Sequence, residues 1–216
     1  MAKREGINYP KFKDQFAVID FEAEPMPVLS LFPAPPALRL EEATLTLTGL
    51  AGERATLGWS ELKGLPRVRE RAPLVCQIFN WSESPMVEGV RLADVLRLTR
   101  LDAREHAYWG CYSADGLYFE TLPWSMACDR RTLLVFGLEG APLPQAHGGP
   151  LRLWVPFLQG YKSVKWLHLV RAFRKDPVGI KRLLGQSRTA ILGADGQEKA
   201  DVVVARPASG EGLAEI

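Results

Sequence analysis

Short apolar runs separated by glycine and proline are the feature of this sequence that most constrains its fold. Nineteen glycines and sixteen prolines are spread along the 216 residues. This spacing favours a strand-and-turn architecture over a helical bundle. Residues 43–50, ATLTLTGL, alternate threonine with leucine, so they predict a strand with one exposed and one buried face.

The remaining elements follow from the same patterns. Further strands are predicted at 74–79, 107–112, 117–122, 132–138, 151–156 and 166–173. The pair around Ser113-Ala114-Asp115-Gly116 predicts a β-hairpin. Short helices are predicted at 59–65, 92–98 and 123–128, and RVRER at 67–71 is interpreted as an exposed connection. The expected fold class is α+β, a β-rich mixed single domain.

The composition changes along the chain divide it into three parts. Residues 1–40 are rich in charge and proline and predict an N-terminal arm that lies over the domain at 41–175. Residues 176–216 are expected to form a partly flexible C-terminal extension, with a second hairpin signal at Asp195-Gly196. A run of basic residues near this boundary predicts a solvated patch, with docking of an acidic redox partner as the alternative. The patch comprises Arg171, Arg174, Lys175, Lys181, Arg182 and Arg188.

Charge and cysteine content exclude several classes of protein. A net charge of +2 gives no general attraction to nucleic acid. No apolar stretch approaches the length of a transmembrane span, and the first residues show no secretory leader, so no membrane segment and a cytoplasmic location are expected. Three cysteines, odd in number and widely spaced, indicate neither a disulfide framework nor a zinc cluster.

Residues 147–166, HGGPLRLWVPFLQGYKSVKW, combine a turn, a buried strand and a basic loop. Arg152 interrupts the apolar strand, and Lys162, Ser163 and Lys165 follow the tight spot at Gly160. Ammonium groups and a hydroxyl beside backbone N–H donors suit an anion, phosphate above all. On spacing alone the alternative stays open that Arg152 pairs with a carboxylate and the lysines lie on a solvated edge.

Cys76 is the candidate ligand for a soft metal. A thiolate suits a polarizable metal ion, although a cysteine in an apolar strand, taken alone, is more often an inert core residue. Cys76 is followed by Trp81-Ser82 and then by Glu88-Gly89-Val90, a segment that enters a predicted helix. Cys111 and Cys128 lie beside no such motif and are interpreted as structural.

These motifs together resemble those of the sulfite-oxidase-like molybdopterin-binding oxidoreductases, in particular the short bacterial single-domain members. The resemblance spans about residues 45–173, and HGGPLRLWVP with GYKSVKWL is its most specific part. It implies a molybdenum–molybdopterin (Mo-molybdopterin) cofactor, with Cys76 as the metal ligand and catalytic residue. The cofactor-binding residues that it implies are Ser113, His147, Arg152, Lys162, Ser163, Val164 and Lys165. For Ser113 and His147, plain turn roles remain the alternative.

The resemblance implies an oxidoreductase in which the cofactor performs oxo transfer and the protein orients it. Residues 77–80, QIFN, carry no positive charge, which favours a small neutral S-oxide or N-oxide as the substrate. Sulfite oxidation and a cofactor-less binding module remain alternatives, whereas a thiol hydrolase lacks a nucleophile–base motif. The expected partners are a small-molecule substrate and a separate electron-transfer protein.

Overall fold

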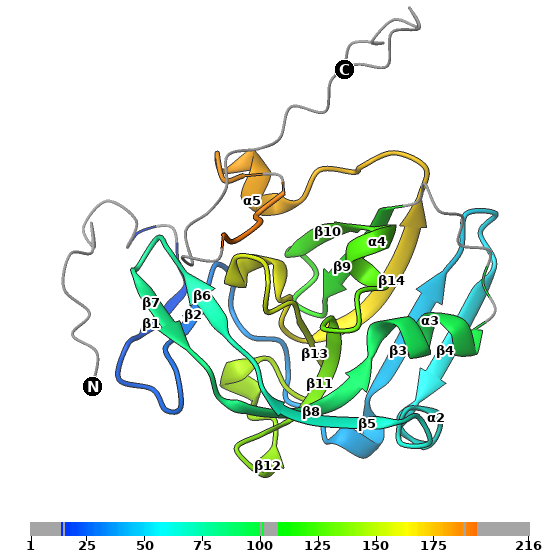
Figure 1. The fold of residues 1–216 in the computed structure, drawn as a ribbon, viewed down its shortest axis with the longest axis horizontal. Helices are drawn as coiled ribbons and strands as arrows, with labels where there is room; N and C mark the ends of the chain where they lie inside the picture. The colour runs from blue at the N-terminus through cyan, green and yellow to red at the C-terminus, as the bar shows by residue number, and fades with distance from the viewer. Residues whose placement is uncertain (1–13, 15, 100, 102–107, 188, 194–216) are drawn as a thin grey trace, which may run out of the picture.

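A five-stranded sheet forms one half of the structure, a computed structural model that describes residues 14, 16–99, 101, 108–187 and 189–193 (Figure 1). Its order is β10-β9-β14-β3-β4, and only β14 and β3 run parallel. Its strands are β3 (Thr44–Thr48), β4 (Arg54–Gly58), β9 (Tyr108–Ser113), β10 (Phe119–Pro123) and β14 (Leu167–Phe173). Leu45 and Leu47 are fully buried while the threonines between them are not, so the alternating strand is confirmed.

A second sheet is covered by apolar side chains on both faces. It contains β5 (Arg67–Arg71), β8 (Met86–Arg91), β11 (Leu133–Leu138), β12 (Ala141–Pro142) and β13 (Arg152–Trp154). Every residue of β11 is buried; Leu134 and Phe136 pack in one core cluster, and Leu133 and Val135 in the other. A strand between two cores needs a continuous apolar run, which explains the sequence LLVFGL.

Two small two-stranded sheets pack in the second core cluster, the one that contains Leu133 and Val135. They are β1 (Val18–Asp20) with β2 (Val28–Ser30), and β6 (Leu74–Cys76) with β7 (Trp81–Glu83). Figure 1 shows them at the side of the molecule opposite β3 and β4. Met26 of the arm is fully buried, and Phe16 lies edge-on to Phe79 with ring centroids 5.2 Å apart. The described part of the arm, 14 and 16–40, therefore includes residues that pack on the domain.

The α-helices formed by the described residues are few and short. They are α2 (Trp59–Leu62), α3 (Leu92–Thr99), α4 (Trp124–Ala127) and α5 (Ile180–Leu183). The expected α+β, β-rich fold class is confirmed. Among the described residues, no helix has the length and apolar character needed to cross a membrane.

The structure differs from the sequence-based expectations at residues 67–71 and 74–79. Residues 67–71 are not a connection: β5 pairs with β8 as an edge strand, and its mostly exposed charged side chains suit an edge. The strand expected at 74–79 ends at Cys76, because Asn80 N–H donates to the Gln77 carbonyl and closes a turn. The hairpin expected at Asp195-Gly196 lies outside the described residues.

Candidate functional site

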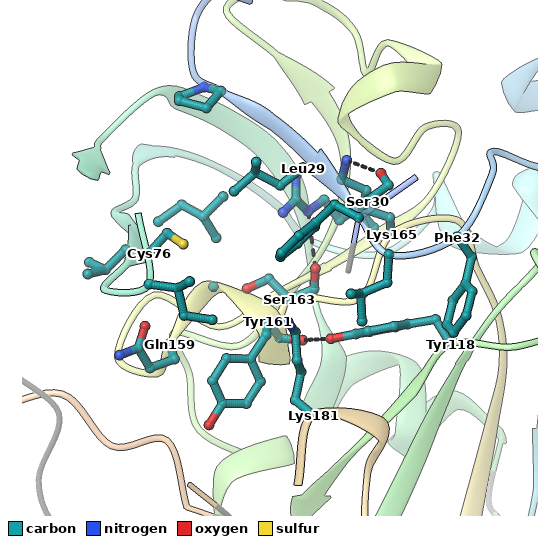
Figure 2. A pocket seen from close by; sticks show the side chains of 18 of the residues that line it. Leu29, Ser30, Phe32, Cys76, Tyr118, Gln159, Tyr161, Ser163, Lys165 and Lys181 are labelled. Carbon is teal, nitrogen blue, oxygen red and sulfur yellow. Dashed lines mark hydrogen bonds between the residues drawn. The ribbon is translucent and has the colours of Figure 1, made fainter. Parts of the chain in front are cut away.

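One pocket brings together the cysteine and three of the basic-loop residues singled out in the sequence. Its empty volume is about 830 Å³, and Cys76, Arg152, Ser163 and Lys165 all line it. That volume includes space that is open to solvent. In Figure 2, Cys76 and Lys165 lie on different sides of the pocket with Ser163 between them. Residues far apart in the sequence therefore meet at one cavity.

Cys76 is positioned by a close approach of two backbone segments. It ends β6, opposite Trp81 of β7, and is partly exposed. Val75 forms a bridge with Gln159, and a Cβ at Gly160 would lie 2.9 Å from the Val75 carbonyl oxygen. Only glycine permits this approach, which places the start of the basic loop beside the cysteine. Burial raises the pKa of the Cys76 thiol; the backbone amides of Phe79 and Ile78 and the Lys181 ammonium oppose that shift.

Arg152 is a buried cation without a carboxylate partner among the described residues. Its side chain, on β13, is 4% exposed. Nη1 donates to the His147 carbonyl at 2.8 Å and Nε to the Ser163 carbonyl at 3.3 Å, so the guanidinium is held by neutral acceptors alone. Burial lowers its pKa to about 9, which still leaves it charged at neutral pH.

Lys165 and Ser163 add two more donors to the same pocket. The Lys165 ammonium donates to Ser30 Oγ at 3.0 Å and to the Ala146 carbonyl at 2.8 Å. Burial, and then repulsion from Arg152, lower the Lys165 pKa well below its ordinary value. Ser163 Oγ accepts the Val155 N–H at 3.0 Å, which leaves its own hydrogen available to the pocket.

Among the described residues, neither Arg152 nor Lys165 has an ion pair, because Asp115, which lines the same pocket, accepts the Leu117 and Tyr118 N–H groups instead. Two cations that converge without an ion pair are costly to a protein unless an anion joins them. The residues present therefore fit a phosphate-bearing group. Within the described part of the chain, no cluster of three or more His, Cys, Asp or Glu side chains could hold a metal by itself. A metal at Cys76 would take its remaining ligands from a cofactor, and a thiolate is a donor that suits molybdenum.

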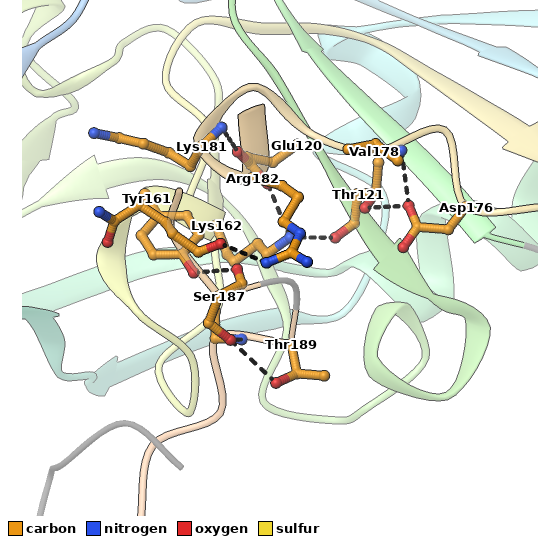
Figure 3. Close-up of polar contacts among 12 residues, drawn as sticks. Glu120, Thr121, Tyr161, Lys162, Asp176, Val178, Lys181, Arg182, Ser187 and Thr189 are labelled. Atoms are coloured by element: carbon orange, nitrogen blue, oxygen red, sulfur yellow. Dashed lines mark hydrogen bonds and ion pairs between the residues drawn. The ribbon is translucent and has the colours of Figure 1, made fainter. Parts of the chain in front are cut away.

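Lys162 is directed away from this pocket. Its ammonium donates to Glu120 Oε2 at 2.8 Å and to the Thr121 carbonyl at 3.1 Å, and it is absent from the pocket wall. The sequence predicted a phosphate contact, whereas the structure shows its charge already balanced by a buried carboxylate (Figure 3). Residues 160–162 form a 3-10 turn, so Lys162 and Ser163 face different surroundings.

The other predicted cofactor residues are not among those that line the pocket. Ser113 N–H donates to the Tyr118 carbonyl, and its Oγ accepts the Asp115 N–H at 3.3 Å, a turn-stabilising arrangement. The backbone N–H of buried Val164 donates to the Lys162 carbonyl at 3.1 Å. His147 Nε2 lies 2.9 Å from the Glu24 carbonyl oxygen, and its Nδ1 has no partner among the described residues. Through its carbonyl, His147 supports Arg152.

Lys181 is the wall residue that the sequence did not identify. The interpretation that placed it in a solvated basic patch is wrong, because its side chain is 5% exposed and lines the pocket. Its backbone N–H donates to Glu120 Oε1 at 2.8 Å, a contact between residues 61 positions apart. No local pattern separates Lys181 from its exposed neighbour Arg182. The tertiary contact with Glu120 makes the difference.

The family model and the relatives that this chain resembles are all described as oxidoreductases. Residues 32–180 match the family model described as the oxidoreductase molybdopterin binding domain. The chain is 27% identical over 154 residues to the uncharacterized oxidoreductase YuiH of Bacillus subtilis (strain 168), covering 71% of this chain and 76% of that protein. It is 28% identical over 151 residues to the protein-methionine-sulfoxide reductase catalytic subunit MsrP of Gluconobacter oxydans (strain 621H), covering 62% and 48%.

Two more comparisons concern larger proteins. A sulfite oxidase of Arabidopsis thaliana is 28% identical over 180 residues, covering 68% of this chain and 46% of that protein. The crystal structure of the sulfane dehydrogenase SoxCD from Paracoccus pantotrophus superposes with a TM-score of 0.61 at 21% identity, covering 76% and 46%, which shows a shared fold. The chain spans about half the length of these relatives and of MsrP, and about three quarters of YuiH. From the family match over most of its described length, together with the motifs that it carries, this chain belongs to the sulfite-oxidase-like molybdopterin-binding oxidoreductases.

Proposed function

We propose that this chain binds Mo-molybdopterin and transfers oxygen from a small neutral S-oxide or N-oxide. One observation carries the proposal: Cys76 and the uncompensated cations Arg152 and Lys165 line a single pocket. A thiol at one side and a phosphate-binding group at the other match the two ends of a metal cofactor that ends in a phosphate.

The chain's residues divide the work of holding this cofactor. When bound, Mo-molybdopterin supplies two-electron oxo-transfer chemistry. Arg152, Lys165 and Ser163 hold the phosphate with charge-assisted hydrogen bonds, and Cys76 is the metal ligand. His147 orients Arg152 through its carbonyl oxygen, which accepts Nη1 at 2.8 Å. Apolar side chains at the Cys76 end exclude water from the reaction.

The wall around Cys76 supports a neutral substrate. Phe16, Leu29 and Ile78 line it together with the amide of Gln159. A small dianion such as sulfite needs several charged donors in a desolvated site. Beyond Arg152 and Lys165, the described residues that line the pocket provide a single cation, Lys181. The overall reaction joins the oxide with two electrons and two protons and yields the deoxygenated product and water. We further propose that a separate electron-transfer protein supplies the electrons, and the similarity to a methionine-sulfoxide reductase subunit supports this direction.

Sulfite oxidation is a second candidate, because one observation favours it. Lys181 adds a cation to the wall of the same pocket, and an oxyanion would profit from that charge. The similarity to a plant sulfite oxidase agrees with it.

Metal content and steady-state assays test these proposals together. Protein purified from a molybdenum-replete host should contain one molybdenum atom per chain, and Cys128→Ser should retain it while Cys76→Ser shows an altered metal spectrum.

The substrate is tested by comparing turnover of sulfoxides and N-oxides, with a reduced dye as electron donor, with turnover of sulfite, with an artificial electron acceptor. Turnover of the neutral oxides supports the first candidate. Efficient sulfite turnover without measurable turnover of the oxides would replace it with the second.

A further inference from the structure

Lys181 is held against the pocket by its backbone rather than by its charge. Its N–H donates to Glu120 Oε1 at 2.8 Å. Gly179 precedes α5, and a Cβ there would lie 2.2 Å from Glu120 Oε2, so only glycine lets the helix begin this close to the carboxylate. Glu120 also binds the Lys162 ammonium. The position of α5 is therefore tied to the basic loop.

The Lys181 ammonium itself has no hydrogen-bond acceptor in the part of the chain that the structure describes. Figure 3 shows its side chain running away from Glu120, and Figure 2 shows it entering the pocket on a different side from Lys165. Among the described residues, the Phe16 ring, 4.8 Å away, is the partner of its Nζ, and no carboxylate or carbonyl accepts from it. With no acceptor among the described residues, this ammonium keeps donors for a molecule bound in the pocket that it lines.

The Lys181 ammonium lies apart from Arg152 and Lys165, the two cations assigned to the phosphate. It lines the same pocket as Cys76, and its Nζ lies 4.8 Å from the ring of Phe16, which packs edge-on against Phe79, three residues after Cys76. Arg152 and Lys165 already provide two cations for a phosphate. An ammonium on the cysteine side is therefore placed for the molecule that reacts at the metal.

We propose that Lys181 is the specificity-determining residue of this pocket, and that its ammonium donates a hydrogen bond to the oxygen of the substrate's S–O or N–O bond. This inference rests on the proposed function. That oxygen gains negative charge as its bond to sulfur or nitrogen breaks, so the ammonium stabilises the transition state more than the bound substrate. A single donor also explains how a largely apolar wall can orient a neutral, polar oxide.

The first test measures the charge beside Cys76 in protein prepared without cofactor. Cys76 is alkylated with anionic iodoacetate and with neutral iodoacetamide, and the modified peptide is quantified separately from Cys111 and Cys128. The thiolate attacks the CH₂ carbon of either reagent and displaces iodide, so the ratio of the two rates is independent of the Cys76 pKa. Lys181→Met should lower the iodoacetate-to-iodoacetamide ratio about three- to tenfold, the effect of removing one charge several ångströms away at a partly solvated site.

Matched variants give this test its controls. Lys181→Arg keeps the charge and should keep the ratio. Lys175→Met removes an equal charge from an exposed neighbouring position and should leave the ratio unchanged. Methionine preserves the buried stem of Lys181 and its backbone contact with Glu120; Lys181→Gln provides a second neutral variant if the first does not fold. An unchanged ratio in the neutral variants overturns the inference, whatever the enzyme's substrate is.

The second test uses the cofactor-loaded enzyme. Lys181→Met should keep its molybdenum content yet lose about 10- to 100-fold in kcat/KM for the oxide, the range expected when one hydrogen bond to a charged group is removed. Lys181→Arg should recover part of that loss. An unchanged kcat/KM overturns the inference. If wild-type enzyme reduces no oxide while the alkylation ratio still depends on Lys181, the charge assignment stands and the proposed substrate fails.

Discussion

The ammonium of Lys162 and the carboxylate of Glu120 form an ion pair of 2.8 Å in which the side chains are only 3% and 1% exposed. Burial raises the pKa of Glu120, and Lys162 acts against that shift. The other oxygen of the carboxylate accepts the Lys181 N–H. One buried pair thus connects the basic loop with α5, two segments that contribute to the same pocket.

Breaking this pair should destabilise the fold. Lys162→Met leaves Glu120 buried with its charge uncompensated, so we expect the free energy of unfolding to fall by about 3 to 5 kcal/mol. Combining it with Glu120→Gln should recover much of that loss, because two neutral groups need no partner. Urea denaturation of both single variants and the double variant measures the coupling. The exposed pair Arg39–Glu42 is the control, and Glu42→Gln should leave the urea midpoint nearly unchanged because solvent screens the pair. If the double variant lost as much free energy of unfolding as the two single variants together, the two side chains would not be coupled and the expectation would be contradicted.

Cys76→Ser should separate metal ligation from folding. Cys76 is partly exposed at the end of β6, so serine fits the site and the melting temperature should change little. Activity should be lost and the electronic spectrum of the metal should change, since a hydroxyl is a harder donor than a thiolate. Cys128→Ser, at a partly exposed cysteine absent from the pocket wall, is the matched control. A Cys76→Ser enzyme with the native spectrum and rate would show that the metal has another ligand.

Arg152→Met should purify folded but depleted of cofactor. Each charge-assisted hydrogen bond to a phosphate contributes about 1.5 to 3 kcal/mol, so the affinity for cofactor should fall at least tenfold. Molybdenum and pterin content per chain, measured after gel filtration, report the retention. Arg174→Met removes an exposed arginine and should remain fully loaded. Full loading of Arg152→Met would place the phosphate elsewhere.

Lys165 should make the stability of the cofactor-free protein depend on pH. Burial lowers its folded pKa well below the unfolded value of 10.5, so between these two values the unfolded chain binds more protons than the folded chain. The free energy of unfolding should therefore rise as the pH increases through that window and fall again on acidification. Lys165→Met should flatten this slope and, at neutral pH, raise the stability of the empty protein while lowering cofactor retention. Thermal melts of both proteins across alkaline pH test this prediction. If Lys165→Met kept the wild-type dependence of stability on pH, Lys165 would not be its cause.

Met26 should anchor the arm. Its side chain is fully buried in the cluster that contains Phe79 and Trp81, so Met26→Ala should cost about 2 to 5 kcal/mol through lost contacts and the cavity left behind. Leu38→Ala, at a residue 53% exposed, should stay within about 0.5 kcal/mol of wild type. Equal effects of the two substitutions would mean that the arm contributes no core.

Local sequence patterns were sufficient to predict most of the strands and to identify the family. Alternation predicted β3, the Asp115-Gly116 turn predicted the β9–β10 hairpin, and the loop motif predicted that Arg152, Ser163 and Lys165 belong to one site. These features depend on side-chain periodicity and turn chemistry, which are properties of neighbouring residues. The edge strand β5 was missed because charged residues in an exposed edge look like a loop.

The sequence by itself determined the kinds of donor available: a thiol for a metal and a cluster of ammonium, guanidinium and hydroxyl groups for a phosphate. Only the tertiary structure decided which of them face the pocket. Lys162, inside the loop motif, turns to Glu120, whereas Lys181, from a segment that reads as solvated, enters the wall. The reason is that the direction of a side chain depends on partners distant in sequence: here one carboxylate on β10 pairs with the Lys162 ammonium and accepts the backbone N–H of Lys181.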